Sequence, residues 1–126
     1  MNTIRIRNAR VYNSYTQSFE EKSVLIRGEQ FVQLQETEEE MRQKVDQEID
    51  AQGRWMLPGL IDIHMHVESS MTIPTEFSRQ ALSFGVTTVV ADPHEIANVF
   101  GLKGIEAFMD SEPVMDIFYG IPSSVP

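Results

Sequence analysis

The sequence has 126 residues, no cysteine, and 19 acidic against 10 basic side chains, which gives a net charge of −9. Its length suits one domain of ordinary size, and 41% hydrophobic residues are enough to form a core. The negative charge argues against a basic surface for nucleic acid or anionic lipid. Without cysteine, neither a disulfide scaffold nor a thiolate metal site can form.

No apolar run approaches the ~20 residues that a membrane-spanning helix needs. The first residues also lack the apolar segment and cleavage site of a secretory signal. We therefore expect a cytoplasmic protein whose partner is a small-molecule substrate, with no role for nucleic acid or membrane.

The first 57 residues have the pattern of a small β domain. Residues 2–13 alternate apolar and polar side chains and predict a half-buried strand with a kink or a short hairpin. The runs at 23–27 and 31–34 flank Gly28 and indicate a hairpin, with a bulged single strand as the alternative. Residues 36–45 predict a short surface helix or an acidic loop, and 48–51 and 54–57 two brief strands.

The pattern changes after Pro58 and Gly59, where strands and helices begin to alternate. Residues 60–64 predict a buried strand, 86–91 a β-branched strand and 116–120 a third strand. Between the first two, Pro74 marks the start of a helix that Gly85 ends. A second helix follows the middle strand, with an apolar face formed by Leu102, Ile105, Phe108 and Met109. This order predicts an α/β fold with parallel strands and right-handed crossovers.

His64 and His66 stand at the end of the first of these strands. Side chains two apart on a strand point to the same face, so both imidazoles can reach one zinc-like ion at ~2.0–2.1 Å. The alternative is a pair of hydrogen-bonded histidines without function. Because Glu68 follows two residues later, where the chain turns polar, we interpret the pair as metal ligands.

A second cluster, Asp92, His94 and Glu95, ends the next strand. In parallel α/β folds, functional groups gather beyond the carboxyl ends of the strands, so the two clusters should meet on one side of the sheet. The alternatives are that Asp92 caps the following segment and that His94 and Glu95 are solvated. Glu68 and Ser69 either bind substrate or order the loop.

Two histidines do not complete a hydrolytic centre. A catalytic metal normally has three protein ligands and an open position for water, whose pKa it lowers towards neutrality. Among the remaining side chains, His94 and a few carboxylates can supply what is missing.

These residues resemble the start of an amidohydrolase-superfamily enzyme, and more narrowly a bacterial adenine deaminase. The likeness runs through residues 58–71, which contain His-Met-His-Val-Glu-Ser-Ser-Met, and through 85–99, which contain Asp-Pro-His-Glu-Ile-Ala-Asn. Residues 122–126, Pro-Ser-Ser-Val-Pro, are similar to the family's stretch after barrel strand three. The His-x-His element alone marks only the superfamily; its extensions are more specific.

The resemblance implies a division of the chain into two parts. Residues 1–57 would be the N-terminal part of a small β-sandwich, which returning C-terminal strands complete. Residues 58–126 would be the first three βα units of a metal-dependent (β/α)8 barrel.

It also implies a reaction and roles for individual residues. The family hydrolyses adenine to hypoxanthine and ammonia in purine salvage, using Mn²⁺ or Fe²⁺, with Zn²⁺ as a further possibility. His64 and His66 match metal ligands, and His94 is a candidate third ligand. Glu95 is a candidate catalytic acid or base, and the candidate substrate contacts are Glu68, Ser69 and Asp92.

The chain is short for this family, because a full barrel takes ~250 residues and the later metal ligands have no counterpart here. We therefore expect a fragment that needs the missing C-terminal part, or a homo-oligomer, for activity. One alternative is a non-catalytic remnant or associating module, since three strands leave an open edge. Another is a different amidohydrolase that acts on a cyclic amide or amidine.

Overall fold

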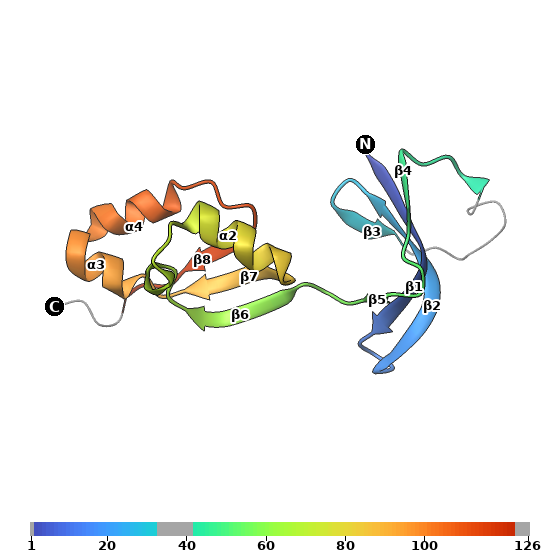
Figure 1. Ribbon diagram of the computed structural model, residues 1–126, viewed down its shortest axis with the longest axis horizontal. Coiled ribbons are helices and arrows are strands. Elements are labelled where there is room, and N and C mark those ends of the chain that lie inside the picture. The colour runs from blue at the N-terminus through green and yellow to red at the C-terminus, as the bar shows by residue number, and fades with distance from the viewer. Residues whose placement is uncertain (1, 33–41, 123–126) are drawn as a thin grey trace. The chain divides into compact units, whose positions relative to one another are not determined.

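The computed structural model describes residues 2–32 and 42–122, and its chain forms two compact units, Met1–Pro58 and Gly59–Pro126 (Figure 1). The first unit is a β-sheet. Its strands are β1 (Thr3–Asn13), β2 (Ser18–Arg27), β3 (Gln30–Val32), β4 (Gln47–Asp50) and β5 (Trp55–Met56). They are ordered β3-β2-β1-β4, and β5 also pairs with β1.

The central strand of this sheet is β1, which is antiparallel to β2 and parallel to β4 and β5. Its pairing with β2 shifts register between Ile6 and Ala9. Asn8 has a φ of 54° there, a left-handed conformation that asparagine tolerates better than most residues. The predicted kink is confirmed, and so is the hairpin around Gly28, since β2 and β3 are antiparallel neighbours.

Two brief strands were predicted after the acidic segment, and β4 and β5 confirm both. Most of the segment itself, up to residue 41, lies outside the described residues. The expected surface helix or acidic loop at 36–45 therefore stays a prediction.

The second unit alternates strands and helices around a parallel sheet (Figure 1). Its elements are β6 (Leu60–Met65), the 3₁₀ turn η1 (Glu68–Ser70), α2 (Pro74–Ser83), β7 (Val86–Ala91), α3 (His94–Phe100), α4 (Leu102–Met109) and β8 (Asp116–Tyr119). The strand order β6-β7-β8 confirms the predicted parallel βαβαβ arrangement. Pro74 occupies the first turn of α2, and Gly85 follows its end with a φ of +87°, as predicted.

The predicted second helix is instead two helices, α3 and α4. Gly101 joins them with a φ of 62° and a ψ of −152°, a conformation open to glycine and strained for other residues. The apolar stripe that predicted one helix belongs to α4, but Leu102 and Met109 are largely exposed.

The expectation that residues 60–64 form a buried strand is wrong for this unit. Leu60, Ile61 and Ile63 on β6 are each more than half exposed. Within the described sheet β6 has one neighbour, β7, and successive side chains point to opposite faces. Apolar side chains on both faces of this edge strand therefore remain open to solvent.

Small side chains form the tightly packed interior around the middle strand. Val89 and Ala91 of β7 are almost completely buried, and so are Val67 and Pro93 in the turns that follow β6 and β7. The turns beyond the strand ends are therefore anchored in the core. Among the described helices, none is long and apolar enough to cross a membrane.

Candidate metal centre

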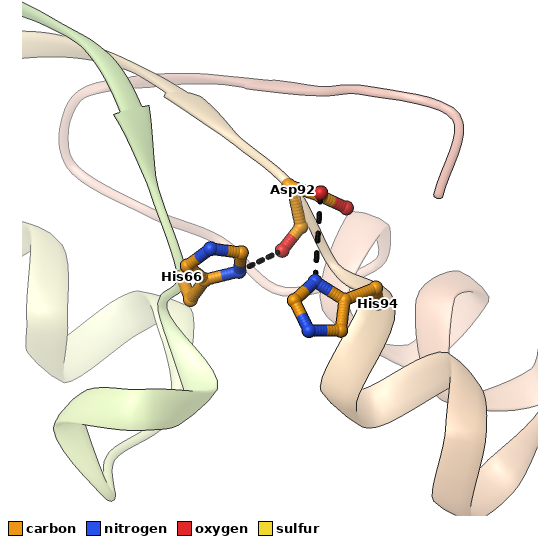
Figure 2. Close-up of side chains that lie close together, drawn as sticks. All are labelled: His66, Asp92 and His94. Atoms are coloured by element: carbon orange, nitrogen blue, oxygen red, sulfur yellow. Dashed lines mark hydrogen bonds and ion pairs between the residues drawn. The ribbon is translucent and has the colours of Figure 1, made fainter. Parts of the chain in front are cut away.

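Three polar side chains meet where β6 and β7 end. His66 follows β6, Asp92 follows β7, and His94 is the first residue of α3. Figure 2 shows the two imidazoles on either side of Asp92. One ligand-type atom from each residue lies within 4.8 Å of the other two. Because the strands are parallel, their carboxyl ends share one edge, and the predicted meeting of the two clusters is confirmed for these three residues.

His66 is oriented by the main chain of the neighbouring strand. Its Nδ1 lies 2.8 Å from the carbonyl oxygen of Asp92. A carbonyl oxygen can only accept, so Nδ1 carries a hydrogen, and in the neutral imidazole Nε2 keeps a free lone pair. The amide of Asp92 in turn donates to the carbonyl oxygen of Met65 at 2.9 Å. The strand pairing thus sets the position of the imidazole.

Asp92 and His94 lie close together without completing a hydrogen bond. Carboxylate Oδ2 and imidazole Nδ1 are 3.5 Å apart, and both side chains are about three-quarters buried. Neither Asp92 Oδ1 nor His94 Nδ1 has a hydrogen-bond partner among the described residues. Buried polar atoms are rarely left unpaired. Together with a ring nitrogen of His66, these two atoms offer one oxygen and two nitrogen ligands. Such a mixture suits a divalent cation.

His64 stands apart from this group of three. Its ring centre is 5.1 Å from that of His66, in an edge-to-face arrangement, while the centres of His66 and His94 are 4.6 Å apart. The His64 side chain is exposed, and its amide donates to Asp62 Oδ1 at 3.1 Å. The structure therefore brings His66 and His94 together, with His64 at the rim.

The remaining predicted site residues connect the two strand ends. Glu68 Oε1 accepts the amide hydrogen of Ile96 at 3.1 Å, and the hydroxyl of Ser69 donates to Glu95 Oε2 at 2.6 Å. Ser69 and Glu95 are both exposed. These four residues link the η1 turn to the first turn of α3.

The sequence interpretation did not include Tyr119, the last residue of β8. Burial raises its pKa to about 12, and the nearby charge of Glu68 acts in the same direction. Its hydroxyl lies 3.3 Å from the carbonyl oxygen of Phe108. The rule that pointed to the ends of the first two strands could have identified it, because Tyr119 ends the third.

The family model for the amidohydrolase family matches residues 55–124. This chain belongs to that family. The match covers all elements of the second unit, including the residues of the candidate centre. The resemblance inferred from the His-x-His element is thereby confirmed.

Curated relatives of this amidohydrolase chain carry a narrower name. An adenine deaminase of Clostridium perfringens is 56% identical over 121 residues, which are 96% of this chain and 21% of the relative. Adenine deaminase 2 of Shouchella clausii is 49% identical over 96% of the chain and 22% of that protein. Adenine deaminase 2 of Oenococcus oeni is 46% identical over 98% and 22%. The chain spans about a fifth of the length of these relatives.

Solved structures share the fold at low sequence identity. A prolidase complexed with N-methylphosphonate-L-proline aligns with a TM-score of 0.58 and 21% identity, over 94% of this chain and 31% of that one. The formyltransferase/hydrolase complex of Methylorubrum extorquens aligns with a TM-score of 0.56 and 19% identity, over 71% and 20%. These likenesses concern the mixed α/β fold alone.

Proposed function

We propose that this chain is the N-terminal part of an enzyme that hydrolyses adenine to hypoxanthine and ammonia. The observation that carries the proposal is the group of His66, Asp92 and His94 at the ends of two parallel strands. The names of the curated relatives supply the substrate. In the reaction, water adds at C6 of the purine, the bond from C6 to the exocyclic nitrogen breaks, and that nitrogen leaves as ammonia.

We assign the binding of a divalent cation to His66 and His94, with Asp92 as the oxygen ligand of the same group and His64 as a further candidate ligand from the rim. The mixed nitrogen and oxygen donors suit Mn²⁺ or Fe²⁺, with Zn²⁺ also acceptable. Such an ion lowers the pKa of a bound water and so supplies a nucleophile near neutral pH. The unpaired Oδ1 of Asp92 is buried, so we propose it as a ligand of the cation and not as the substrate contact expected from the sequence.

Proton transfer is the role proposed for Glu95. It is exposed at the start of α3, one residue after His94. Its Oε2 accepts a hydrogen bond from Ser69, which orients a carboxylate that can carry a proton to the leaving nitrogen. Glu68 and Ser69 were predicted as substrate contacts, but their hydrogen bonds to α3 favour the different role argued below.

The wider setting of the centre is also proposed. We propose that the parallel βαβαβ unit forms the first three βα units of a (β/α)8 barrel and that the five-stranded sheet is part of a small β-sandwich. The remaining barrel strands would come from the rest of the enzyme or from a second copy. The exposed apolar side chains of β6 are consistent with such pairing. We propose that the complete enzyme acts in purine salvage in the cytoplasm.

Titration calorimetry of the 126-residue chain with Mn²⁺ tests the metal centre. We expect saturable binding, and we expect His66→Ala and His94→Ala each to lower the affinity for Mn²⁺. The loss should exceed the about 10- to 100-fold that removal of an outer-shell partner typically causes. Glu106→Ala is the control, because this exposed glutamate lies on α4, away from the centre. Unchanged affinity in both histidine variants would refute the assignment.

Ammonia release from adenine by the full-length enzyme tests the reaction. We expect His66→Ala to abolish it and Glu106→Ala to leave it unchanged. Turnover of a hydantoin-type cyclic amide in place of adenine would favour the alternative that the enzyme is an amidohydrolase acting on a cyclic amide or amidine. A full-length protein that binds Mn²⁺ but hydrolyses neither compound would favour a non-catalytic module.

A further inference from the structure

Two side chains that follow β6 reach across to the beginning of α3. Glu68 accepts the amide hydrogen of Ile96 at 3.1 Å, and Ser69 donates to Glu95 at 2.6 Å. Ile96 and Glu95 lie in the first turn of α3, directly after His94. The turn that carries His66 is therefore hydrogen-bonded to the helix that carries His94.

The two turns are also held together by the hydrogen bond from His66 to the Asp92 carbonyl and by buried side chains. Val67, next to Glu68, has no exposed surface, and Pro93, next to His94, is almost fully buried. These residues fix where the turns begin. Hydrogen bonds beyond them are needed to set the direction in which α3 starts, and hence the position of the His94 imidazole.

The carboxylate oxygens of Glu68 do not have the surroundings expected of a side chain that only binds substrate. One oxygen is used by Ile96, and the other, Oε2, is buried without a hydrogen-bond partner in the described part of the chain. Leaving a carboxylate oxygen in this state costs free energy. One oxygen is thus occupied by a main-chain amide and the other is closed to solvent, where an incoming substrate would have to meet it.

We propose that Glu68 is a positioning residue for the metal centre, which holds the start of α3 so that His94 faces His66. The inference rests on the proposed metal centre. Ser69 supports the same link through Glu95. Outer-shell partners of this kind orient the ligands, and their loss typically lowers metal affinity about 10- to 100-fold.

The experiment compares three variants of the full-length enzyme: Glu68→Ala, Glu68→Gln and the exposed control Glu106→Ala. Without metal, amide hydrogen exchange at Ile96 reports the link itself. With Mn²⁺, calorimetry reports the affinity. We expect Glu68→Ala to lose protection at Ile96 and to bind Mn²⁺ about 10- to 100-fold more weakly. Glu68→Gln keeps an oxygen acceptor for the Ile96 amide, so it should restore both.

The outcomes separate this inference from the proposed function. If the unmodified enzyme fails to bind Mn²⁺, the metal centre is refuted, while loss of Ile96 protection in Glu68→Ala alone would still establish the link. If the unmodified enzyme binds and Glu68→Ala binds equally well, the positioning role is refuted. Equal weakness of Glu68→Gln and Glu68→Ala would also overturn it, because charge rather than the hydrogen bond would then matter. Exchange at Val89 in the core of β7 shows whether each variant is folded.

Discussion

His66 donates the hydrogen on Nδ1 to the main-chain carbonyl oxygen of Asp92 across 2.8 Å. In the neutral imidazole the second nitrogen is thereby left as an acceptor, on the edge of the ring that faces away from this carbonyl (Figure 2). Histidines that bind metals usually donate their other ring hydrogen in this way, which fixes the tautomer and the ring orientation. Since the acceptor here is backbone, the arrangement comes from the pairing of β6 with β7 and not from a neighbouring side chain.

The tautomer of His66 can be measured in the metal-free chain. We expect ¹⁵N spectra, recorded at a pH where the imidazole is neutral, to show the hydrogen on Nδ1, because the Asp92 carbonyl accepts it. Asp92→Asn should leave this unchanged, since the carbonyl remains. Observation of the hydrogen on Nε2 in the unmodified chain would contradict the arrangement.

Tyr119 should make the second unit sensitive to high pH. Its pKa is raised from 10 to about 12, chiefly by burial and also by the charge of Glu68. The folded chain therefore keeps the phenol proton that the unfolded chain loses, so stability is intact below pH 10 and falls as the pH rises towards 12. The difference corresponds to at most roughly 3 kcal/mol.

Urea unfolding across this pH range, compared with Tyr119→Phe, checks the expectation. The variant should lose less free energy of unfolding than the unmodified chain between pH 10 and about 12. Its lower stability at neutral pH, from the lost contact to Phe108, does not affect this slope. Parallel pH curves for the two proteins would show that Tyr119 is not the cause.

Asp46 should make the first unit sensitive to acid. Its carboxylate accepts hydrogen bonds from the hydroxyl and the amide of Thr3, both at 2.7 Å, which lower its pKa below 3.8. The stabilisation is therefore complete above pH 3.8 and lost as the pH falls through the lowered value. Unfolding midpoints should drop less steeply with acid in Asp46→Asn than in the unmodified chain.

Thr3→Val provides the matched test, because it removes the hydroxyl and leaves the amide. We expect it to reduce the acid sensitivity partly, and the double variant with Asp46→Asn to add little. Strictly additive effects of the two changes would indicate that the residues act independently.

The parts of the fold that local pattern decides were predictable. Alternation predicted β1, and the Pro74 and Gly85 signals predicted α2, because each depends on residues near one another in sequence. The division of the second helix at Gly101 was not predicted, since the apolar stripe used for that prediction lies entirely within α4 and says nothing of the residues before it. The exposure of β6 was missed for a different reason: whether an apolar strand is buried depends on neighbours that lie elsewhere in the chain.

The candidate site was predictable to the same extent. The ends of parallel strands place His66, Asp92 and His94 at one edge, and topology alone suffices for that. Which atoms face each other was not predictable, because the ring of His66 is set by a main-chain carbonyl. The contact from Glu68 to Ile96 was not predictable either, because its partner is a main-chain amide that no residue type or spacing in the sequence indicates.

Gly104 shows how the packing of α4 reaches the metal centre. A Cβ atom at this position would lie 2.9 Å from the carbonyl oxygen of Ile96 and equally close to side-chain atoms of Ile96 and Phe100. The Ile96 side chain can rotate away, but the Ile96 carbonyl and the Phe100 Cβ are fixed to the backbone of α3 and move only with the helix. Gly104→Ala should therefore displace the residue that Glu68 binds.

Two effects compete in Gly104→Ala. Alanine favours a helix by about 1 kcal/mol relative to glycine, while overpacking typically costs about 1–3 kcal/mol. Because a backbone atom blocks the space, we expect overpacking to prevail, with a net loss of up to about 2 kcal/mol. Urea unfolding measures this loss, and hydrogen exchange at Ile96 shows whether α3 has moved. Lys103→Ala on the same helix is the control, and it should change neither. If Gly104→Ala were more stable than the unmodified chain and Ile96 exchange were unchanged, the contact between α3 and α4 would accommodate the added methyl group without displacing Ile96.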